Sequence, residues 1–144
     1  MNHKNEVIEM LLVENNEAII DFFKVLTKKF DMQVKYVTNT TEFVELVKKY
    51  DFKNIICDVD LSYKFEGIFI SNLYNNIKKI RNIDGKMYLL SDRIVPNIDG
   101  KFNFDGILPK KFQEIYDFLI QNYEFKSYHK SIDQIASLET AVPS

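Results

Sequence analysis

The sequence predicts an α/β fold, a doubly wound parallel sheet of five strands. Short apolar runs of strand length recur along the chain, and segments with apolar residues three and four positions apart follow most of them. Parallel neighbours need crossover connections, and right-handed crossovers place helices on both faces of a sheet. A chain of 144 residues with 46% hydrophobic and 28% charged residues has enough material for one core. We therefore expect one domain over residues 1–124.

The first half of the chain alternates strand and helix twice. Residues 7–13 form a near-continuous apolar run, the pattern of a strand buried on both faces. Residues 17–30 carry apolar side chains at helical spacing, and residues 33–37 are a short second strand. Asn39 followed by Glu42 is an N-cap and capping-box signal for a helix over residues 40–50.

The second half continues the alternation. Strands are expected at residues 54–58, 86–91 and 105–108, and the last helix at residues 111–123. A polar loop over residues 60–67 precedes a helix whose expected inner face carries Phe69, Ile70, Leu73, Ile77 and Ile80. The segment after residue 91 contains Pro96 and Gly100 and has no sustained helical period, so the fourth helix should be weak.

Composition excludes several classes of protein. A net charge of −2 provides no basic surface for nucleic acid, and no apolar run reaches the roughly 20 residues of a membrane span. The first ten residues lack the apolar core of a signal peptide, and Cys57, as the single cysteine, forms no internal disulfide. These features favour a cytoplasmic protein without direct nucleic-acid or membrane partners. Cys57 is expected to be a small buried apolar residue.

Polar residues follow four of the predicted strands. Ligands of such sheets bind at the carboxyl ends of the strands, so these residues should meet at one edge. Gathered carboxylates favour a hard cation such as Mg²⁺, a lysine holds phosphoryl oxygens, and an aspartate can accept phosphate. The residues concerned are Glu14 with Asn15, Asp58 with Asp60, Ser91 with Asp92, and Lys110. The pattern suits Mg²⁺-assisted phosphoryl transfer to Asp58.

Four motifs within residues 7–123 resemble the receiver domain of bacterial two-component response regulators. They are LLVEN, IICD, YLLS and GILPKKF, in the family's order and near its separations. The resemblance implies a flavodoxin-like sheet with strand order 2-1-3-4-5. It also implies that Asp58 accepts phosphate from a histidine kinase or phosphotransfer protein, and that signalling proceeds by contact with an output domain or partner protein. Such a chain is no conventional enzyme beyond its own phosphorylation and dephosphorylation.

The same resemblance implies the site residues. Glu14, Asp58 and the Asp60 backbone carbonyl would hold Mg²⁺, with Asn15 as a weak further ligand. Ser91, as the switch hydroxyl, and Lys110 would bind the phosphoryl oxygens.

The chain departs from the family pattern at several positions. Asn15 replaces the second acid of the first motif, which should weaken Mg²⁺ binding, and Ile107 replaces the usual switch aromatic. Asp92 follows the switch hydroxyl where a small residue is common, Lys111 follows the lysine where proline is usual, and Ser62 stands where proline is usual after the acceptor. These changes favour an alternative function, a pseudo-receiver that acts by protein contact without phosphorylation.

Simpler interpretations of the same residues stay open. Asp58 could be a strand-end acid that starts a turn, Glu14 and Asn15 could cap a helix, Ser91 could be a plain strand-end hydroxyl, and Lys110 could be solvated. A flavodoxin-like binder of a small phosphorylated ligand is a third option, although no Gly-rich loop follows the first strand.

Residues 125–144 are expected to form a separate linker or tail. Ser131 and Gln134 are a capping-box signal for a short helix with Ile132, Ile135 and Leu138 on one stripe. A helix this short needs a surface to cover. It could pack on the domain, pair with a second copy in a homodimer or lead into an output domain. A disordered tail is the remaining alternative.

Overall fold

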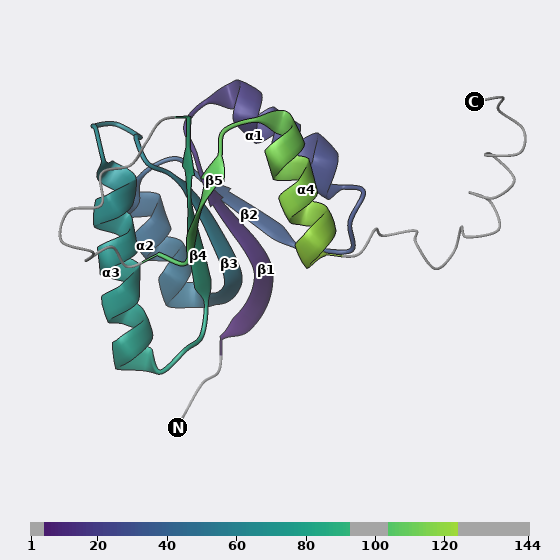
Figure 1. Cartoon of the computed structure of the whole chain (residues 1–144). Coiled ribbons are helices and arrows are strands. Elements are labelled where there is room, and N and C mark those ends of the chain that lie inside the picture. The colour runs from purple at the N-terminus through teal and green to yellow at the C-terminus, as the bar shows by residue number, and fades with distance from the viewer. Residues whose placement is uncertain (1–4, 93–103, 124–144) are drawn as a thin grey trace, which may run out of the picture.

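A computed structural model describes residues 5–92 and 104–123, which form a parallel sheet covered by helices (Figure 1). The strand order is β2-β1-β3-β4-β5, the flavodoxin-like order that the sequence predicted. The strands are β1 (Glu6–Val13), β2 (Val34–Val37), β3 (Tyr50–Asp58), β4 (Lys86–Ser91) and β5 (Gly106–Pro109). The described helices are α1 (Glu17–Thr27), α2 (Thr40–Lys49), α3 (Glu66–Arg81) and α4 (Phe112–Asn122).

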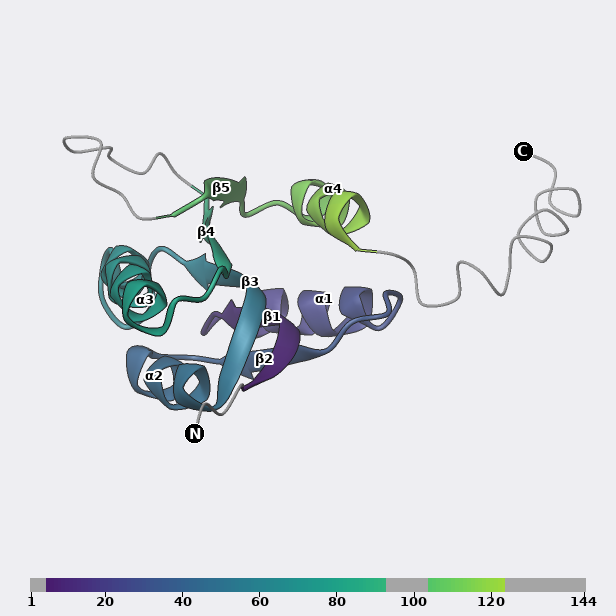
Figure 2. The ribbon, with the colours of Figure 1, turned by 90° about the horizontal axis from the view of Figure 1, so that it is seen from below.

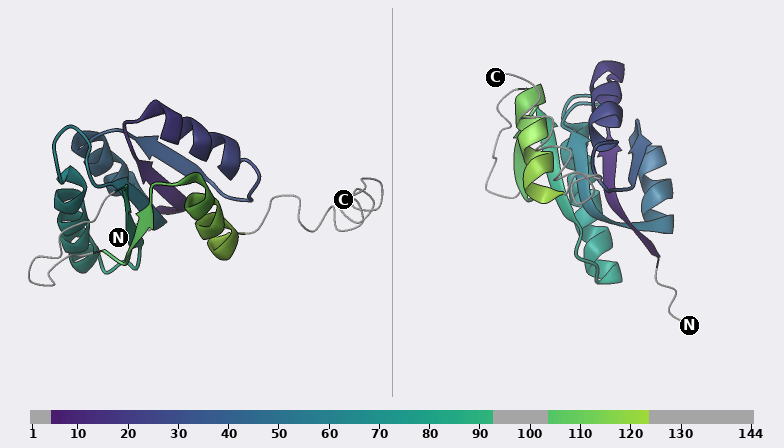
Figure 3. Two further views of the ribbon diagram at one scale, coloured as in Figure 1. Left: turned by 45° about the horizontal axis from the view of Figure 1, so that its top comes forward. Right: turned by 90° about the vertical axis from the view of Figure 1, so that its right-hand side faces the viewer.

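The helices cover the sheet on both faces, with α1 and α4 on one side and α2 and α3 on the other (Figure 2). Two further views show the same arrangement (Figure 3). Because alternate side chains of β1 and β3 point to opposite faces, each strand supplies both cores. Leu11 and Ile55 belong to the core under α2 and α3, and Leu12 and Ile56 to the core under α1 and α4. All four are at most 1% exposed, which explains the unbroken apolar runs in the sequence.

The register aligns the carboxyl ends of the strands. Val13 pairs with Cys57, Asp58 with Leu90, and Ser91 with Pro109. The residues that end β1 and β3, or follow β1 and β5, therefore lie at one edge, which we call the carboxyl edge of the sheet.

Side-chain caps fix the starts of two helices. The Asn39 side chain accepts a hydrogen bond from the Glu42 amide at 2.9 Å, as predicted. The Glu42 carboxylate accepts from the Thr38 amide at 2.7 Å. The α1 cap is Asn16, which accepts from the amides of Ala18 and Ile19. Asn16 thus takes the capping role for which the sequence also offers Glu14 and Asn15.

Several boundaries differ from the sequence prediction. Helix α1 ends at Thr27, three residues before the predicted end, and β1, β2, α2 and α4 each differ by one residue at one end or both. Strand β3 begins at Tyr50, four residues earlier than predicted, directly after α2. In this added segment Phe52 is buried, and Asp51 is paired with Arg81 from the end of α3. Strand β5 covers residues 106–109, one residue later than predicted.

The inner face of α3 also differs. Phe69 and Ile80, which were expected to face inward, are 51% and 83% exposed. The buried α3 residues are Glu66, Gly67, Ile70, Ser71 and Tyr74. Small side chains at Gly67 and Ser71 let this face of the helix lie close to the sheet, with Ile70 and Tyr74 buried beside them, so Phe69 lies on the outer face. Phe112 of α4, whose apolar side chain at helical spacing with Ile115 and Leu119 predicts an inward position, is likewise exposed.

Some predictions concern residues outside the described ranges. The weak fourth helix after β4 and the tail helix of residues 125–144 both fall there, so the division into domain and tail stays a prediction. In the part of the chain that is described, no helix is long and apolar enough to cross a membrane.

Tyr74 offers a test of the core. Its hydroxyl is buried and has no hydrogen-bond partner among the described residues, and burial raises its pKa to about 12. We expect Tyr74→Phe to stabilise the fold by about 1 kcal/mol, because an unsatisfied buried hydroxyl is removed. Tyr123→Phe is the control of opposite sign, since the Tyr123 hydroxyl lies 2.5 Å from Asn54 Nδ2 and donates to the Glu9 carbonyl. Urea unfolding of both variants measures the difference, and a destabilised Tyr74→Phe would contradict this account.

Candidate functional site

Three charged side chains from three separate segments meet at the carboxyl edge of the sheet. Asp58 ends β3, Glu14 directly follows β1, and Lys110 directly follows β5. The Lys110 Nζ atom lies 2.9 Å from Asp58 Oδ2 and 3.3 Å from Glu14 Oε2. Two acids and one ammonium group therefore form a single cluster, which we call the acid-lysine cluster.

Glu14 is the most buried member of this cluster. It is 0% exposed, and its Oε1 atom accepts hydrogen bonds from the backbone amides of Asn15 and Asn16 at 3.0 Å each. Its Oε2 atom has no hydrogen-bond partner among the described residues, although Lys110 is within ion-pair distance. Burial, followed by the closeness and negative charge of the Asp58 carboxylate, raises the pKa of Glu14 to about 7. The site therefore holds a carboxyl group that is readily neutralised.

Lys110 is held by backbone and side-chain contacts. Its amide donates to the Ser91 carbonyl at 2.8 Å, which places the start of the β5–α4 connection beside the end of β4. Burial alone would lower the pKa of Lys110, but the hydrogen bond to Asp58 and the charges of both acids outweigh it and raise that pKa. The ammonium group therefore stays charged against the two acids.

Hydrogen bonds hold the loop after Asp58 against the Asp58 side chain. The Asp60 amide donates to Asp58 Oδ1 at 3.1 Å, and Asp60 Oδ1 accepts from the Phe65 amide at 2.6 Å. Phe65 has a φ of 65°, a left-handed conformation that is rare for a bulky residue. The loop thus has a defined, locally strained shape next to Asp58.

Glu66 is a residue of this region that the sequence analysis did not assign. It is 3% exposed and accepts hydrogen bonds from the Ser62 amide at 2.8 Å and the Thr40 hydroxyl at 2.6 Å. The sequence signal was an acid directly before Gly67, at the junction between the polar loop and the predicted helix. Its contacts join the loop after Asp58 to the start of α2.

Gly67 allows α3 to lie close to the end of β3. Its amide donates to the Val59 carbonyl at 2.8 Å, and a Cβ atom at this position would lie 2.1 Å from the Asp58 carbonyl oxygen. Only glycine leaves room for that oxygen. The position of Asp58 therefore depends on the absence of a side chain at residue 67.

The remaining predicted residues occupy different positions at this edge. Ser91 is buried at the end of β4, beside the Lys110 backbone, whereas Asn15 and Asp92 are exposed. The Asn15 amide contacts Glu14, but its side chain is at the surface. Cys57 is buried as predicted, and burial raises its pKa well above the ordinary value.

The donor set can be compared with the needs of a divalent cation. The part of the chain that is described contains no group of three His, Cys, Asp or Glu side chains arranged to hold a metal ion. Mg²⁺ commonly uses one or two carboxylates and keeps several waters. Glu14, whose Oε2 atom lacks a hydrogen bond, and Asp58 supply two such carboxylates. The residues present thus fit a hard, partly hydrated cation.

Comparisons with solved structures identify the class of fold. The signal receiver domain of an HD domain-containing protein from Pseudomonas fluorescens superimposes with a TM-score of 0.64 at 15% identity, over 83% of this chain and 94% of that one. A CheY-like response regulator receiver domain from Methylobacillus flagellatus gives a TM-score of 0.58 at 18% identity, over 82% and 98%. The sequence matches no family model and no curated protein.

A third structure is the receiver domain of the sensor histidine kinase PA1611 from Pseudomonas aeruginosa, which has a magnesium ion coordinated in its active site cleft. It gives a TM-score of 0.58 at 18% identity, over 80% of this chain and 96% of that one. The chain therefore has the fold of response regulator receiver domains, as the sequence motifs predicted. At these identities the likeness concerns the fold.

Proposed function

We propose that this chain is a receiver module that accepts a phosphoryl group on Asp58 and passes the signal by protein contact. The observation that supports this most directly is the position of Lys110, 2.9 Å from Asp58 and 3.3 Å from Glu14. The donor is a phosphohistidine of a histidine kinase or phosphotransfer protein, and the output is a further domain or partner protein. The receiver domains with similar folds support this assignment.

In the proposed reaction an Asp58 carboxylate oxygen attacks the phosphorus atom of the phosphohistidine. A phosphorus–oxygen bond forms while the phosphorus–nitrogen bond breaks, and the imidazole leaves with that electron pair and takes a proton from solvent. Lys110 moves its ammonium group from Asp58 Oδ2 to the phosphoryl oxygens. The Asp60 amide, which donates to Asp58 Oδ1, orients the carboxylate. Ser91 supplies a hydroxyl from the end of β4.

Mg²⁺ is the proposed cofactor. Glu14, Asp58 and the Asp60 backbone carbonyl would hold it, with Asn15 at most as a weak further ligand because its side chain is exposed. When bound, the cation neutralises the charge of the acids and of the phosphoryl oxygens.

The test is a titration with beryllium fluoride, a phosphoryl mimic, in the presence of Mg²⁺, followed by amide chemical shifts. We expect saturable, metal-dependent shifts at the carboxyl edge that are lost in Asp58→Ala. The matched control is Asp21→Asn, which removes an exposed acid of α1 and should leave binding unchanged. Absence of any Mg²⁺-dependent effect of beryllium fluoride on the wild-type chain would reject phosphorylation.

A second prediction concerns Asn15. Returning a second acid to this position by Asn15→Asp should tighten Mg²⁺ binding about tenfold or more, because a carboxylate replaces a neutral amide next to Glu14. Isothermal titration of Mg²⁺ into both proteins measures the change. Equal affinities would show that residue 15 does not border the cation site.

A pseudo-receiver that acts by constitutive contact is the alternative function. The specific observations in its favour are that Asn15 beside Glu14 supplies no second acid for a cation, and that the exposed Asp92 adds a negative charge next to Ser91. The beryllium fluoride titration separates the two functions, because only a phosphorylatable receiver responds to the mimic.

A further inference from the structure

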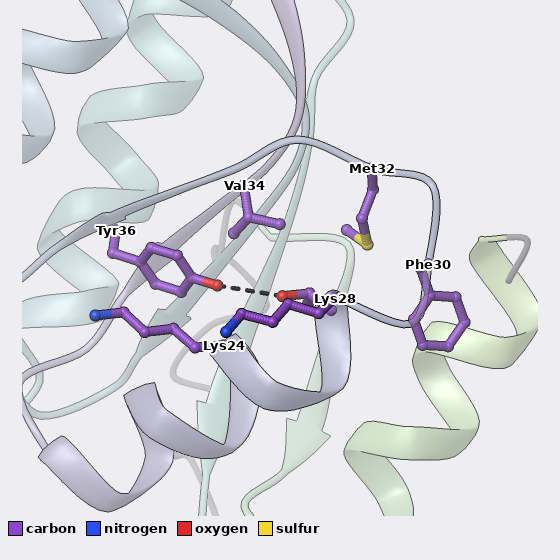
Figure 4. A pocket seen from close by; sticks show the side chains of 7 residues that line it. Lys24, Lys28, Phe30, Met32, Val34 and Tyr36 are labelled. Carbon is purple, nitrogen blue, oxygen red and sulfur yellow. Dashed lines mark hydrogen bonds between the residues drawn. The ribbon is translucent and has the colours of Figure 1, made fainter. Parts of the chain in front are cut away.

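A second concave site lies between the last turn of α1 and the chain that leads into β2. This cavity has a volume of about 370 Å³, within the range of small-molecule sites. Figure 4 shows Lys24 of α1 and Lys28, the C-cap of that helix, on one side, Tyr36 of β2 facing them, and Phe30, Met32 and Val34 along the wall. Thr27, also in the lining, interacts with the Tyr36 hydroxyl at 3.2 Å.

The cavity is separate from the acid-lysine cluster. Helix α1 starts after its cap Asn16, close to Glu14 at the carboxyl edge, and runs back toward the opposite edge. Its 11 residues cover about 16 Å along the axis. Thr27 and Lys28 therefore lie far along the helix from the proposed phosphorylation site, and no residue is shared between the two sites.

The charged side chains that line the cavity are both positive. Lys24 and Lys28 are exposed, neither forms an ion pair with a described acid, and the described lining contains no carboxylate. The Lys24 ammonium lies 5.4 Å from the centre of the Tyr36 ring, a cation–π contact with a residue of the cavity lining. An anion placed here meets two cations and no carboxylate of the described lining.

The hydroxyl groups of Thr27 and Tyr36 add a hydrogen-bond donor to the cavity. Thr27 Oγ1 donates its one proton to the Phe23 carbonyl at 2.6 Å, so the proton shared between Thr27 and Tyr36 comes from Tyr36. At 3.2 Å that bond is long, and the Tyr36 hydroxyl can turn to a ligand at little cost. Burial raises the pKa of Tyr36, so the group remains a donor at neutral pH.

We propose that this cavity binds a small organic anion, a phosphate or carboxylate attached to an aromatic or branched apolar body. The anionic group lies between the ammonium groups of Lys24 and Lys28 and accepts a hydrogen bond from Tyr36. The apolar body packs on Phe30, Met32 and Val34. The two lysines also complement the carbonyl end of α1, so the test separates binding from helix stability.

The experiment titrates phenyl phosphate and phenylacetate separately into the isotopically labelled full chain and follows amide chemical shifts. We expect saturable shifts confined to residues 24–36, with a Kd on the order of 1 mM for ligands of this size. Lys24→Gln/Lys28→Gln should weaken binding at least tenfold, and Tyr36→Phe about threefold. Lys48→Gln/Lys49→Gln, which removes two exposed lysines of α2, is the matched control and should bind as the wild type does.

Control variants and control ligands complete the experiment. Lys24→Arg/Lys28→Arg should retain binding, and thermal unfolding of every variant shows that a loss of binding is not a loss of fold. Tighter binding of one probe supports the proposal and identifies the preferred anion. Benzyl alcohol and inorganic phosphate should each bind at least tenfold more weakly than the better probe. Three results would each overturn the proposal. They are inorganic phosphate binding as tightly as the better probe, the Lys24→Gln/Lys28→Gln variant binding as the wild type does, and neither probe binding saturably.

Discussion

Gly67→Ala is expected to destabilise the fold by about 2 to 3 kcal/mol, because the new methyl group overlaps with backbone rather than with a side chain that can move. The added Cβ atom would lie 2.1 Å from the Asp58 carbonyl oxygen and 2.8 Å from Val59 Cα. Either α3 moves away from the sheet or the end of β3 shifts. The shift displaces Asp58 from Lys110, so the same variant should also lose its response to beryllium fluoride.

A matched glycine provides the control for this prediction. A Cβ atom at Gly106 of β5 would approach only the Tyr88 ring, at 3.3 Å, and a ring can move by a few tenths of an ångström. Gly106→Ala should therefore change the free energy of unfolding by less than about 0.5 kcal/mol. Urea unfolding of both variants measures the difference. If Gly67→Ala were as stable as Gly106→Ala, the close approach of α3 to β3 would not be a constraint on this fold.

The apolar pattern was sufficient to predict the carboxyl ends of β1, β3 and β4, and the resemblance to receiver domains supplied the strand order. Each of these strands is buried on both faces, so each appears as a continuous apolar run that ends where polar residues begin. The carboxyl ends of parallel strands meet at one edge, and this rule selected Glu14, Asp58 and Lys110 before any distance was known. The ion-pair distances among the three follow from the register of the sheet.

Other features depend on tertiary contacts that periodicity does not encode. The start of β3 contains Asp51, whose charge interrupts the apolar pattern and is compensated by Arg81, 30 residues later. The inner face of α3 is set by the small residues Gly67 and Ser71, so a pattern that weights only large apolar side chains selects the wrong face. Glu66 is an acid with two partners on separate segments, and its burial follows only from those partners.

The free energy of unfolding should fall as the pH rises from about 4.5 to about 7 because of Glu14, in the absence of divalent cations. In the folded chain the pKa of Glu14 is raised to about 7 from its ordinary 4.5, chiefly by burial. Below pH 4.5 Glu14 is protonated in both the folded and the unfolded chain, so folding buries no charge at this position. Above pH 7 it is ionised in both, and the folded chain then holds a buried charge. The separation of the two pKa values corresponds to roughly 3 kcal/mol.

Glu14→Gln isolates this contribution. The amide oxygen of the new side chain can still accept from the Asn15 and Asn16 amides, and its NH₂ group can donate to Asp58. We expect the variant to match the wild type near pH 4.5 and to be more stable by about 2 kcal/mol at pH 8. Unfolding in urea with a chelator present, across this pH range, measures the difference between the two proteins. Glu45→Gln, which removes an exposed acid of α2, is the control and should leave the free energy of unfolding close to that of the wild type.

Adding Mg²⁺ connects this pH dependence to the proposed function. A cation bound by the ionised Glu14 favours the charged form, so millimolar Mg²⁺ should stabilise the wild type at pH 8 and reduce the advantage of Glu14→Gln. The variant, which lacks the carboxylate, should gain much less from the cation. A wild type whose stability is independent of pH between 4.5 and 8, and unaffected by Mg²⁺, would show that Glu14 carries no buried charge. The acid-lysine cluster would then be a structural ion pair of Lys110 with Asp58 and no cation site.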